Sequence, residues 1–363
     1  MQIISDAHKD SATPSKPPGG YEWWYFDAID ESTGYSLVVI FYQGNPFSNR
    51  YIRQLENNDD SQAGKPSNFP AISISLYKGR EPVYYGFTEY SSGESDFKTD
   101  KPSAKIGENS LEADFSGPGM RYSLKLNEEL PSGDKIIAEL DFSSGEKSLD
   151  GLHEKPSGSQ QGHTWNLVMP RAKVEGSLSV YRDSELTHTA RIDGLGYHDH
   201  NTGLEPMKDD FRDWYWGRYH FESATLVYYV MNRQDTRQYR GWLIGDKNGE
   251  VLQRYEDIEL KDKGLSIFGL HLARKLVLKN DASSAVIQQS YSLDNGPFYR
   301  RFMSEAFLSL GDQIEKSTGF SEYIYPSRIY WRFLWPLVDM RIRYKREKPH
   351  WVQKSGRLYR WTW

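Results

Sequence analysis

The stretches Tyr21-Glu-Trp-Trp-Tyr-Phe26 and Tyr35-Ser-Leu-Val-Val-Ile-Phe-Tyr42 decide the fold of this 363-residue chain. Both are rich in the β-branched and aromatic residues that favour extended strands. The segment between them, Asp30-Glu-Ser-Thr-Gly34, has the polar and glycine-containing composition of a turn. We therefore predict two strands joined by a turn at the beginning of the folded chain.

Runs of the same kind recur along the rest of the sequence, separated by Gly, Asn, Asp and Pro. They are AISISLY (71–77), VYYGFTEY (83–90), KIIAELDF (135–142), WNLVMP (165–170), KVEGSLSVY (173–181), TLVYYVMN (225–232) and GWLIGD (241–246). No stretch has helical periodicity over more than about three turns. This pattern predicts an all-β protein with few short helices, built as a barrel or a sandwich rather than from βαβ units.

The chain is long enough for two domains, each with its own core. The first set of strands ends near Tyr181, and a second begins after Asp183-Ser184. We predict an N-terminal domain over 21–183 and a C-terminal domain over 184–345. Residues 1–20 lack an apolar segment and are expected to form a flexible leader, and residues 346–363 a basic, aromatic tail.

The composition narrows the classes of function. A net charge of −5 and a pI near 6.0 argue against a nucleic-acid partner. The absence of cysteine excludes thiolate catalysis and cysteine-based zinc sites. The sequence has no glycine-rich phosphate loop, dinucleotide fingerprint or Gly-x-Ser-x-Gly motif. We therefore expect no cofactor and no metal, which leaves acid–base chemistry or the binding of a hydrophobic small molecule.

The strongest candidate site is the glycine-flanked run Tyr197-His-Asp-His-Asn201. If this run is extended, Tyr197, Asp199 and Asn201 share one face, and His198 and His200 share the other. A carboxylate beside a phenol and an amide suits proton donation. Two histidines would suit a metal ion that takes a third ligand from elsewhere. A purely structural polar cluster is the third interpretation.

Three further pairs share a strand face by the same alternation: His163 with Trp165, Trp214 with Trp216, and Glu22 with Trp24. The tryptophans could line a ligand cavity or could be ordinary core. A structural role is the alternative for His163, and a salt bridge that closes a barrel is the alternative for Glu22.

Together these stretches resemble the carotenoid 1,2-hydratase (hydroxyneurosporene synthase) family, which is related to lipocalin-like natural-product cyclases, often called Diels–Alderases. The matching stretches follow one another in order over most of the chain. They include residues 19–28, 41–48, 163–165, 196–203, 214–218, 296–299 and 321–322. The resemblance implies two lipocalin-like β-barrels packed together, with a hydrophobic pocket within or between them. It also implies functional roles for His163, Trp165, Tyr197 and Asp199.

Two residues depart from the family pattern and leave the carotenoid substrate open. His198 stands where the hydratases usually have an apolar residue, and Tyr215 where they tend to have Asp. Neither departure affects Asp199.

These observations predict a cofactor-independent enzyme that protonates an alkene of a hydrophobic isoprenoid or polyene, followed by hydration or cyclisation. Asp199 would be the general acid, held by Tyr197 and His163, because burial can raise a carboxyl pKa by about 3–5 units. The predicted substrate-binding residues are Trp24, Trp214, Trp216, Asn201, His198 and Glu22. A pericyclase acting on a polyene or polyketide and a non-catalytic isoprenoid carrier are the alternatives.

The C-terminal segment from Arg328 has ten Lys or Arg residues against Asp339 and Glu347, and it is rich in tryptophan. Aromatic and basic residues together suit contact with an anionic bilayer surface. A terminal element that packs on a barrel with its cations in water is the alternative. We expect a cytoplasmic protein that could associate peripherally with membranes through this segment.

Overall fold

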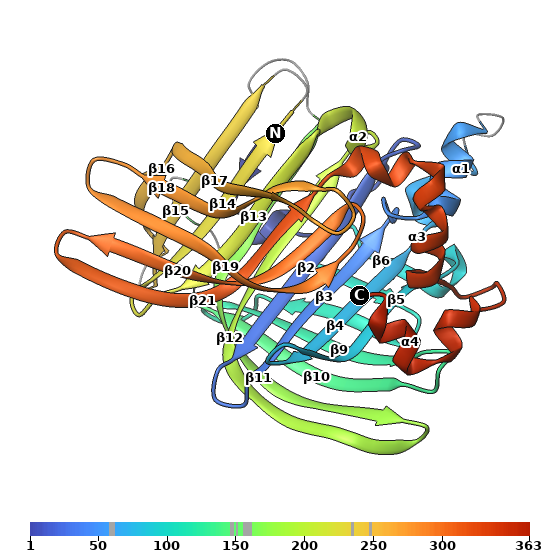
Figure 1. The fold of residues 1–363 in the computed structure, drawn as a ribbon. Helices are drawn as coiled ribbons and strands as arrows, with labels where there is room; N and C mark the ends of the chain where they lie inside the picture. Colours follow the sequence, from blue (N-terminus) through green and yellow to red (C-terminus); the bar gives the residue numbers. More distant parts are fainter. Residues whose placement is uncertain (58–61, 146–148, 150–151, 155–161, 234–235, 247–248) are drawn as a thin grey trace. The chain divides into compact units, whose positions relative to one another are not determined.

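The computed structural model describes residues 1–57, 62–145, 149, 152–154, 162–233, 236–246 and 249–363 (Figure 1). Contacts within the chain divide it into two compact units. Unit 1 consists of Met1–Ser148, Leu152–Pro206 and Trp335–Trp363, and unit 2 of Leu149–Gly151 and Met207–Leu334. Each unit has its own β-sheet.

Unit 1 holds a sheet that has 13 strands among the described residues, in the order β22-β5-β4-β3-β2-β12-β11-β10-β9-β8-β7-β6. Neighbouring strands are antiparallel, except that β1 pairs in parallel with β11 and β22 with β5. The strands are β1 (Gln2–Ile4), β2 (Tyr21–Asp30), β3 (Tyr35–Gln43), β4 (Ala71–Lys78), β5 (Glu81–Glu89), β6 (Ser95–Phe97), β7 (Ser103–Ile106), β8 (Asn109–Asp114), β9 (Met120–Glu129), β10 (Lys135–Ser144), β11 (His163–Arg182), β12 (Glu185–Gly203) and β22 (Arg343–Tyr344).

Unit 2 holds a sheet with nine strands among the described residues, in the order β16-β15-β14-β13-β21-β20-β19-β18-β17. The strands are β13 (Asp213–His220), β14 (Ala224–Asn232), β15 (Arg237–Gly245), β16 (Val251–Tyr255), β17 (Asp257–Leu265), β18 (His271–Lys279), β19 (Ser283–Asn295), β20 (Tyr299–Leu310) and β21 (Gln313–Ile324). β15 near one end of this order contacts β17 at the other end, so the sheet curls almost into a closed barrel.

The helices are short, as the sequence predicts. They are α1 (Asn49–Glu56), α2 (Met207–Asp210), α3 (Trp335–Arg341) and α4 (Gly356–Trp361), with 3₁₀ helices at Ala7–Lys9, Pro66–Asn68, Ser92–Glu94, Pro326–Tyr330, Arg332–Leu334 and Trp351–Lys354. In the part of the chain that the structure describes, no helix is both long and apolar enough to cross a bilayer.

Burial explains why some strands have continuous apolar sequences and others alternate. Every residue of β14 is buried, as are the first eight of β3, so both faces of these strands exclude water. Such strands need apolar residues on both sides. In β9 and β10, buried and more exposed residues alternate instead, because one face meets the core and the other meets solvent.

The predicted turn between β2 and β3 is confirmed in detail. The Asp30 carboxylate accepts hydrogen bonds from the backbone N–H groups of Ser32 and Thr33 and from the Ser32 hydroxyl. Gly34 has a φ of 72°, which a residue without a Cβ adopts readily. The local sequence therefore determines this connection.

The boundary predicted between residues 183 and 184 lies instead at the tip of the long β11–β12 hairpin, and the units divide at Pro206 and Met207. Asp183 and Ser184 have φ angles of 50° and 70°, the positive values required at both central positions of a two-residue hairpin turn. The polar pair therefore resembles a linker in sequence but joins two paired strands.

Residues 1–20, predicted to be a flexible leader, are instead packed into unit 1. Gln2–Ile4 pairs with β11, and Met1, Ala7 and Asp10 are buried. The Trp24 indole N–H donates to the Asp10 backbone carbonyl at 2.8 Å. The segment contributes polar groups that the barrel interior requires.

Asp10 and Lys16 of this segment join three residues of β2 and β12 in a buried charged network, here called the inner network. Its members are Asp10, Lys16, Glu22, His198 and His200. The imidazole of His200 lies between two carboxylates, 3.2 Å from Asp10 and 2.9 Å from Glu22. His198 Nε2 lies 3.0 Å from Asp10, and Lys16 Nζ lies 2.6 Å from Glu22. All five side chains are almost completely excluded from solvent.

The opposite charges of neighbouring side chains shift the pKa values of Asp10, Glu22 and His200. Burial by itself would raise the pKa of Asp10, but the charges and hydrogen bonds of His198 and His200 lower it to about 2. Burial likewise opposes ionisation of Glu22, yet His200 and Lys16 lower its pKa to about 2. Burial would lower the pKa of His200, and the two carboxylates raise it to about 9. The three groups are therefore charged together at neutral pH.

The predicted separate tail, residues 346–363, is also part of unit 1, as are the preceding residues from Trp335. Tyr359 is buried in the hydrophobic core and donates its hydroxyl to the Arg341 carbonyl at 2.6 Å. The Trp363 ring stacks on Tyr85 of β5 with 3.5 Å between centroids. The C-terminus therefore returns to the first sheet rather than completing the second domain, because its apolar side chains find their partners there.

We predict that the free energy of unfolding is highest between about pH 4.5 and 6.5. His200 has a higher pKa when folded, so its contribution is complete below 6.5 and is lost as the pH rises through about 9. Asp10 and Glu22 have lower pKa values when folded, so their contributions are complete above 3.8 and 4.5 and are lost as the pH falls toward about 2. Urea denaturation of the full chain from pH 3 to 10 measures this profile.

His200→Gln is the matched variant for this measurement. It should lower the stability near pH 6 by about 3–5 kcal/mol, because it leaves two buried carboxylates without their shared cation. It should also flatten the decline between pH 6.5 and 9. An unchanged alkaline decline in the variant would show that other groups cause it.

Candidate functional site

Asp199 is the centre of a second polar cluster, on the opposite face of β12 from the inner network. Its Oδ2 accepts hydrogen bonds from the Trp165 indole N–H at 2.8 Å and from the Tyr197 hydroxyl at 2.7 Å. Its Oδ1 accepts from the Asn201 side-chain N–H at 2.9 Å. The Asp199 side chain is buried, and three donors fix the orientation of its carboxyl group.

A relay of hydrogen bonds extends the cluster to His163. Asn201 uses its amide nitrogen on Asp199, so its Oδ1 faces His163 Nε2 at 3.0 Å and accepts a hydrogen bond from it. The other ring nitrogen, Nδ1, lies 3.0 Å from the hydroxyl of Tyr21. The relay therefore runs from Tyr21 through His163 and Asn201 to Asp199.

Strand pairing explains why these residues meet. Trp165 of β11 is opposite Asn201 of β12, and Asp199 is opposite Tyr25 of β2. Directly opposed residues of antiparallel strands project from the same face of the sheet. The structure therefore brings together His163, Trp165, Tyr197 and Asp199, for which the sequence predicts functional roles, and Asn201, which it predicts to bind substrate.

Sequence reasoning missed Tyr21, Trp23 and Tyr25, which lie on this same face. Tyr21 and Trp23 stack with 5.2 Å between their ring centroids, and Trp23 lies 5.9 Å from the His163 ring. Tyr25 packs edge-on against Tyr197 at 6.0 Å. Placing β2 opposite β12 would have identified them, because the odd-numbered residues of β2 then share the face of Asp199.

The glycine that ends the polar run has a steric role at this site. A Cβ atom at Gly203 would lie 2.1 Å from the Tyr21 ring, closer than any non-bonded contact allows. The absence of a side chain at Gly203 lets the Tyr21 ring lie against the strand, where its hydroxyl contacts His163.

Glu22, Trp24 and His198, predicted to bind substrate, lie on the opposite face of the sheet, and the structure does not bring them to Asp199. Glu22 and His198 belong to the inner network. Trp24 stacks on the His200 ring with 4.5 Å between centroids. Even-numbered residues of β2 and β12 point into the core of unit 1, where these three side chains are buried. Their function as substrate-binding residues stays a prediction.

Trp214 and Trp216 belong to unit 2, on β13. They are buried on the face opposite Tyr215 and Tyr219, which join the core of that unit. The shared face predicted for the two indoles is confirmed by this alternation. Their function as substrate-binding residues stays a prediction.

Among the described residues, no three His, Asp or Glu side chains are arranged to hold a metal ion. In the inner network, His200 contacts its two carboxylates through separate ring nitrogens, so the ring lies between them.

The Asp199 cluster has the groups needed to hold and transfer protons. It contains one carboxyl group, two phenols and one imidazole within a single hydrogen-bonded system.

Two curated proteins are similar to most of this chain. Hydroxyneurosporene dehydrogenase of Chlorobaculum tepidum is 27% identical over 350 residues, which cover 92% of this chain and 90% of that protein. Acyclic carotenoid 1,2-hydratase of Rubrivivax gelatinosus is 26% identical over 316 residues, which cover 82% of this chain and 68% of that protein.

Solved structures share the fold at lower identity. CghA with Sch210972 matches with a TM-score of 0.57 and 11% identity, covering 89% of this chain and 98% of CghA. Kievitone hydratase of Nectria haematococca matches with a TM-score of 0.51 and 13% identity, covering 89% of this chain and 98% of that enzyme. The prediction of an all-β fold with two lipocalin-like barrels is confirmed.

The model of the family described as carotenoid hydratase CrtC matches residues 39–351. This range contains the strands β13–β21 of unit 2 and the residues His163, Trp165, Tyr197, Asp199 and Asn201, but not β1, β2 or Tyr21. The match spans well over half of the sequence and agrees with the full-length similarity to the two curated proteins. This chain therefore belongs to the carotenoid hydratase CrtC family.

Proposed function

We propose that this protein is a cofactor-independent enzyme that hydrates or cyclises an acyclic, hydrophobic polyene, with Asp199 as the proton donor. The observation that supports this most directly is the buried Asp199 carboxyl, held by Trp165, Tyr197 and Asn201 on an aromatic face of the sheet. The family match and a relative named acyclic carotenoid 1,2-hydratase support a polyene substrate.

In the proposed step, the protonated carboxyl of Asp199 gives its proton to one carbon of a terminal C=C bond, and the π electrons form the new C–H bond. The more substituted carbon becomes a carbocation. Water then adds to this carbon and returns a proton to the Asp199 carboxylate, which restores the acid. For cyclisation, an internal alkene of the substrate attacks the cation instead. The new cation then loses a C–H proton to the Asp199 carboxylate, which leaves a C=C bond in the product and restores the acid.

The hydrogen bonds fit a carboxyl group that gains and loses a proton. The Trp165 N–H can only donate, so it supports the carboxylate that remains after proton transfer. The Tyr197 hydroxyl can donate or accept, so it can support either protonation state. The rings of Trp23, Tyr25 and Trp165 provide π faces, each able to stabilise a carbocation by about 0.5–2 kcal/mol.

We predict that Asp199→Asn lowers the rate of hydration of an acyclic carotenoid by about 10²–10⁴-fold, the usual contribution of a positioned general acid. Asn keeps the shape of the side chain but has no acidic proton. The assay follows product by liquid chromatography and mass spectrometry in D₂O, where the native enzyme should place one deuterium on carbon. Activity above about one tenth of the native rate would contradict the acid role.

Asp193→Asn is the matched control, since Asp193 is an exposed carboxylate on the same strand. It should leave the rate unchanged. A pericyclic reaction would give product without deuterium on carbon, and a carrier would return the polyene unchanged. A product that has lost two hydrogens would indicate dehydrogenation rather than hydration.

We also propose that the C-terminal segment of unit 1 brings the protein to an anionic membrane surface, where a hydrophobic substrate would dissolve. The Trp351 and Trp361 side chains are 66% and 83% exposed. The cations Lys348, Lys354 and Arg357 are exposed in the same segment. Exposed indoles beside cations favour the interface of a bilayer that contains acidic lipids.

We expect the full chain to float with vesicles that contain phosphatidylglycerol and not with pure phosphatidylcholine vesicles. The double variant Trp351→Ala/Trp361→Ala should reduce flotation several-fold. Ile267→Ala, which removes an 84% exposed apolar side chain from unit 2, is the control and should have no effect. Point variants are preferable to truncation because Tyr359 of this segment is part of the core.

A further inference from the structure

Unit 2 contains a cavity where two neighbouring strands of its sheet separate. β18 and β19 pair from Lys279 and Ser284 to Lys275 and Gln288, and no pairing follows beyond that point. β19 has register irregularities between Gln289 and Tyr291 and again between Ser292 and Asp294. Irregularities of this kind redirect side chains and are common next to ligand sites. The gap has a volume of about 230 Å³.

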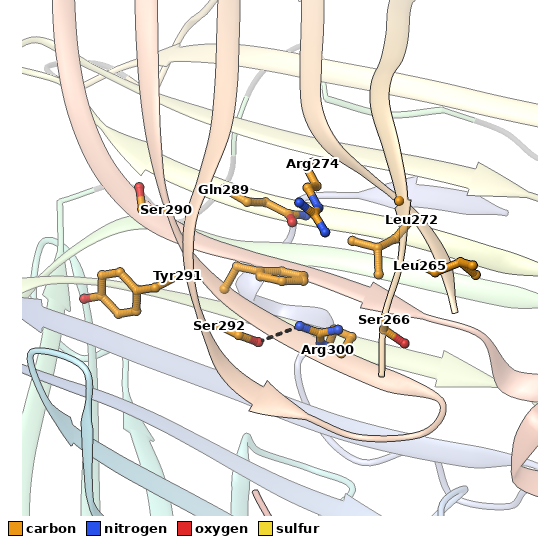
Figure 2. Close-up of a pocket in the computed structure, with 11 residues that line it drawn as sticks. Leu265, Ser266, Leu272, Arg274, Gln289, Ser290, Tyr291, Ser292 and Arg300 are labelled. Atoms are coloured by element: carbon orange, nitrogen blue, oxygen red, sulfur yellow. Dashed lines mark hydrogen bonds between the residues drawn. The ribbon is translucent and has the colours of Figure 1, made fainter. Parts of the chain in front are cut away.

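Among the described residues that line this cavity are two cations and no carboxylate (Figure 2). Arg274 comes from β18 and Arg300 from β20. Gln289 spans the separation, donating from its side chain to the Ala273 carbonyl at 3.0 Å. Apolar side chains, including Leu272 and Phe302, complete the wall. The cavity is therefore electropositive with an apolar side.

Arg300 is half-buried and incompletely paired. Its Nη2 donates to the Ser292 hydroxyl at 3.0 Å, and its guanidinium lies over the Phe302 ring at 5.0 Å. Its Nε is buried and has no hydrogen-bond partner among the described residues. A buried guanidinium donor without an acceptor is costly, and an anion would remove that cost.

The charges around Arg300 also indicate that an anion would be stabilised in this cavity. Burial is the main cause that lowers the pKa of Arg300, and the neighbouring Arg274 lowers it further. Asp294 acts in the opposite direction but does not line the cavity. Within the described chain, the two guanidiniums thus share a cavity without an acidic residue in its wall.

The loop between β17 and β18 contributes a hydroxyl group. The Ser266 Oγ accepts hydrogen bonds from the backbone N–H groups of Phe268 and Leu270 at 3.2 and 3.0 Å. These bonds hold the oxygen in place and use its lone pairs, so its proton is directed to another acceptor. An oxyanion in the cavity would provide that acceptor.

We propose that this cavity binds the phosphate group of a small organic phosphate monoester, with the apolar part of the ligand against Leu272 and Phe302. Two guanidiniums match the two negative charges of the phosphate group, and arginine binds phosphate oxygens in a fixed, two-pronged geometry. The Ser266 hydroxyl completes the donor set, whereas the Ser292 hydroxyl donates to Asn295 Oδ1 at 2.9 Å and holds Arg300 in place. This site is separate from Asp199 and does not depend on the proposed reaction.

The neighbouring cavity of unit 2, about 420 Å³, provides a contrast. Its wall includes Asp213 together with Arg237, Lys263 and His271. Asp213 accepts hydrogen bonds from Arg212 at 3.0 Å and from Asn232 at 2.6 Å. Arg212 also lines this cavity, so it serves as a comparison site that has several cations and one carboxylate in its wall.

Isothermal titration of the full chain with hexyl phosphate and with inorganic phosphate tests the proposal. Hexyl phosphate should bind with one-to-one stoichiometry and more tightly than inorganic phosphate, because only the ester can contact the apolar wall. Arg274→Gln should weaken hexyl phosphate binding by at least about tenfold. Arg274 is exposed, so this variant is expected to fold, and Arg300→Gln provides a second variant with the same expected loss.

Arg237→Gln is the matched control, because it removes the same charge from the neighbouring cavity. It should leave hexyl phosphate affinity within about twofold of the native value. The proposal is overturned if the native protein shows no saturable binding, if inorganic phosphate binds as tightly as the ester, or if Arg237→Gln weakens binding as much as Arg274→Gln.

Discussion

The imidazolium of His200, held between the carboxylates of Asp10 and Glu22, is the interaction on which unit 1 depends. Its two ring nitrogens contact two different segments of the chain, the N-terminal segment and β2. Burying one charge alone is very costly, but alternating charges with short contacts compensate one another. The first twenty residues are therefore part of the barrel, because they supply both an anion and the cation Lys16.

Strand alternation places this network and the Asp199 cluster on opposite faces of β12. His198 and His200 point into the core, where their rings stack on Phe26 and Trp24. Tyr197, Asp199 and Asn201 point the other way. Five consecutive polar residues are tolerated in a buried strand because each face satisfies its own hydrogen bonds.

This arrangement places the inner network on one face of β12 and the residues of the proposed reaction on the other face. In the inner network, the pKa values of Asp10, Glu22 and His200 are displaced so that these three groups stay ionised at neutral pH. The Asp199 cluster has donors of different kinds around one carboxyl, with phenol and imidazole groups that can exchange protons. A rigid charged layer behind β12 would keep the carboxyl positioned while its own proton moves.

The sequence by itself determined the all-β class, the β2–β3 turn and the separation of Asp199 from His198 and His200. These follow from local composition and from the two-residue period of a strand, which are properties of neighbouring residues. It also indicated His163 and Trp165, through the family resemblance.

Only the tertiary structure decided which strands pair and therefore which residues face one another. The register of β2 against β12 selects Tyr21, Trp23 and Tyr25 for the Asp199 face and assigns Glu22 and Trp24 to the core. Asp10 has no local signal, because its partner His200 is 190 positions away in the chain. Long-range pairing depends on the free energy of the whole sheet, and a short stretch of sequence does not contain that information.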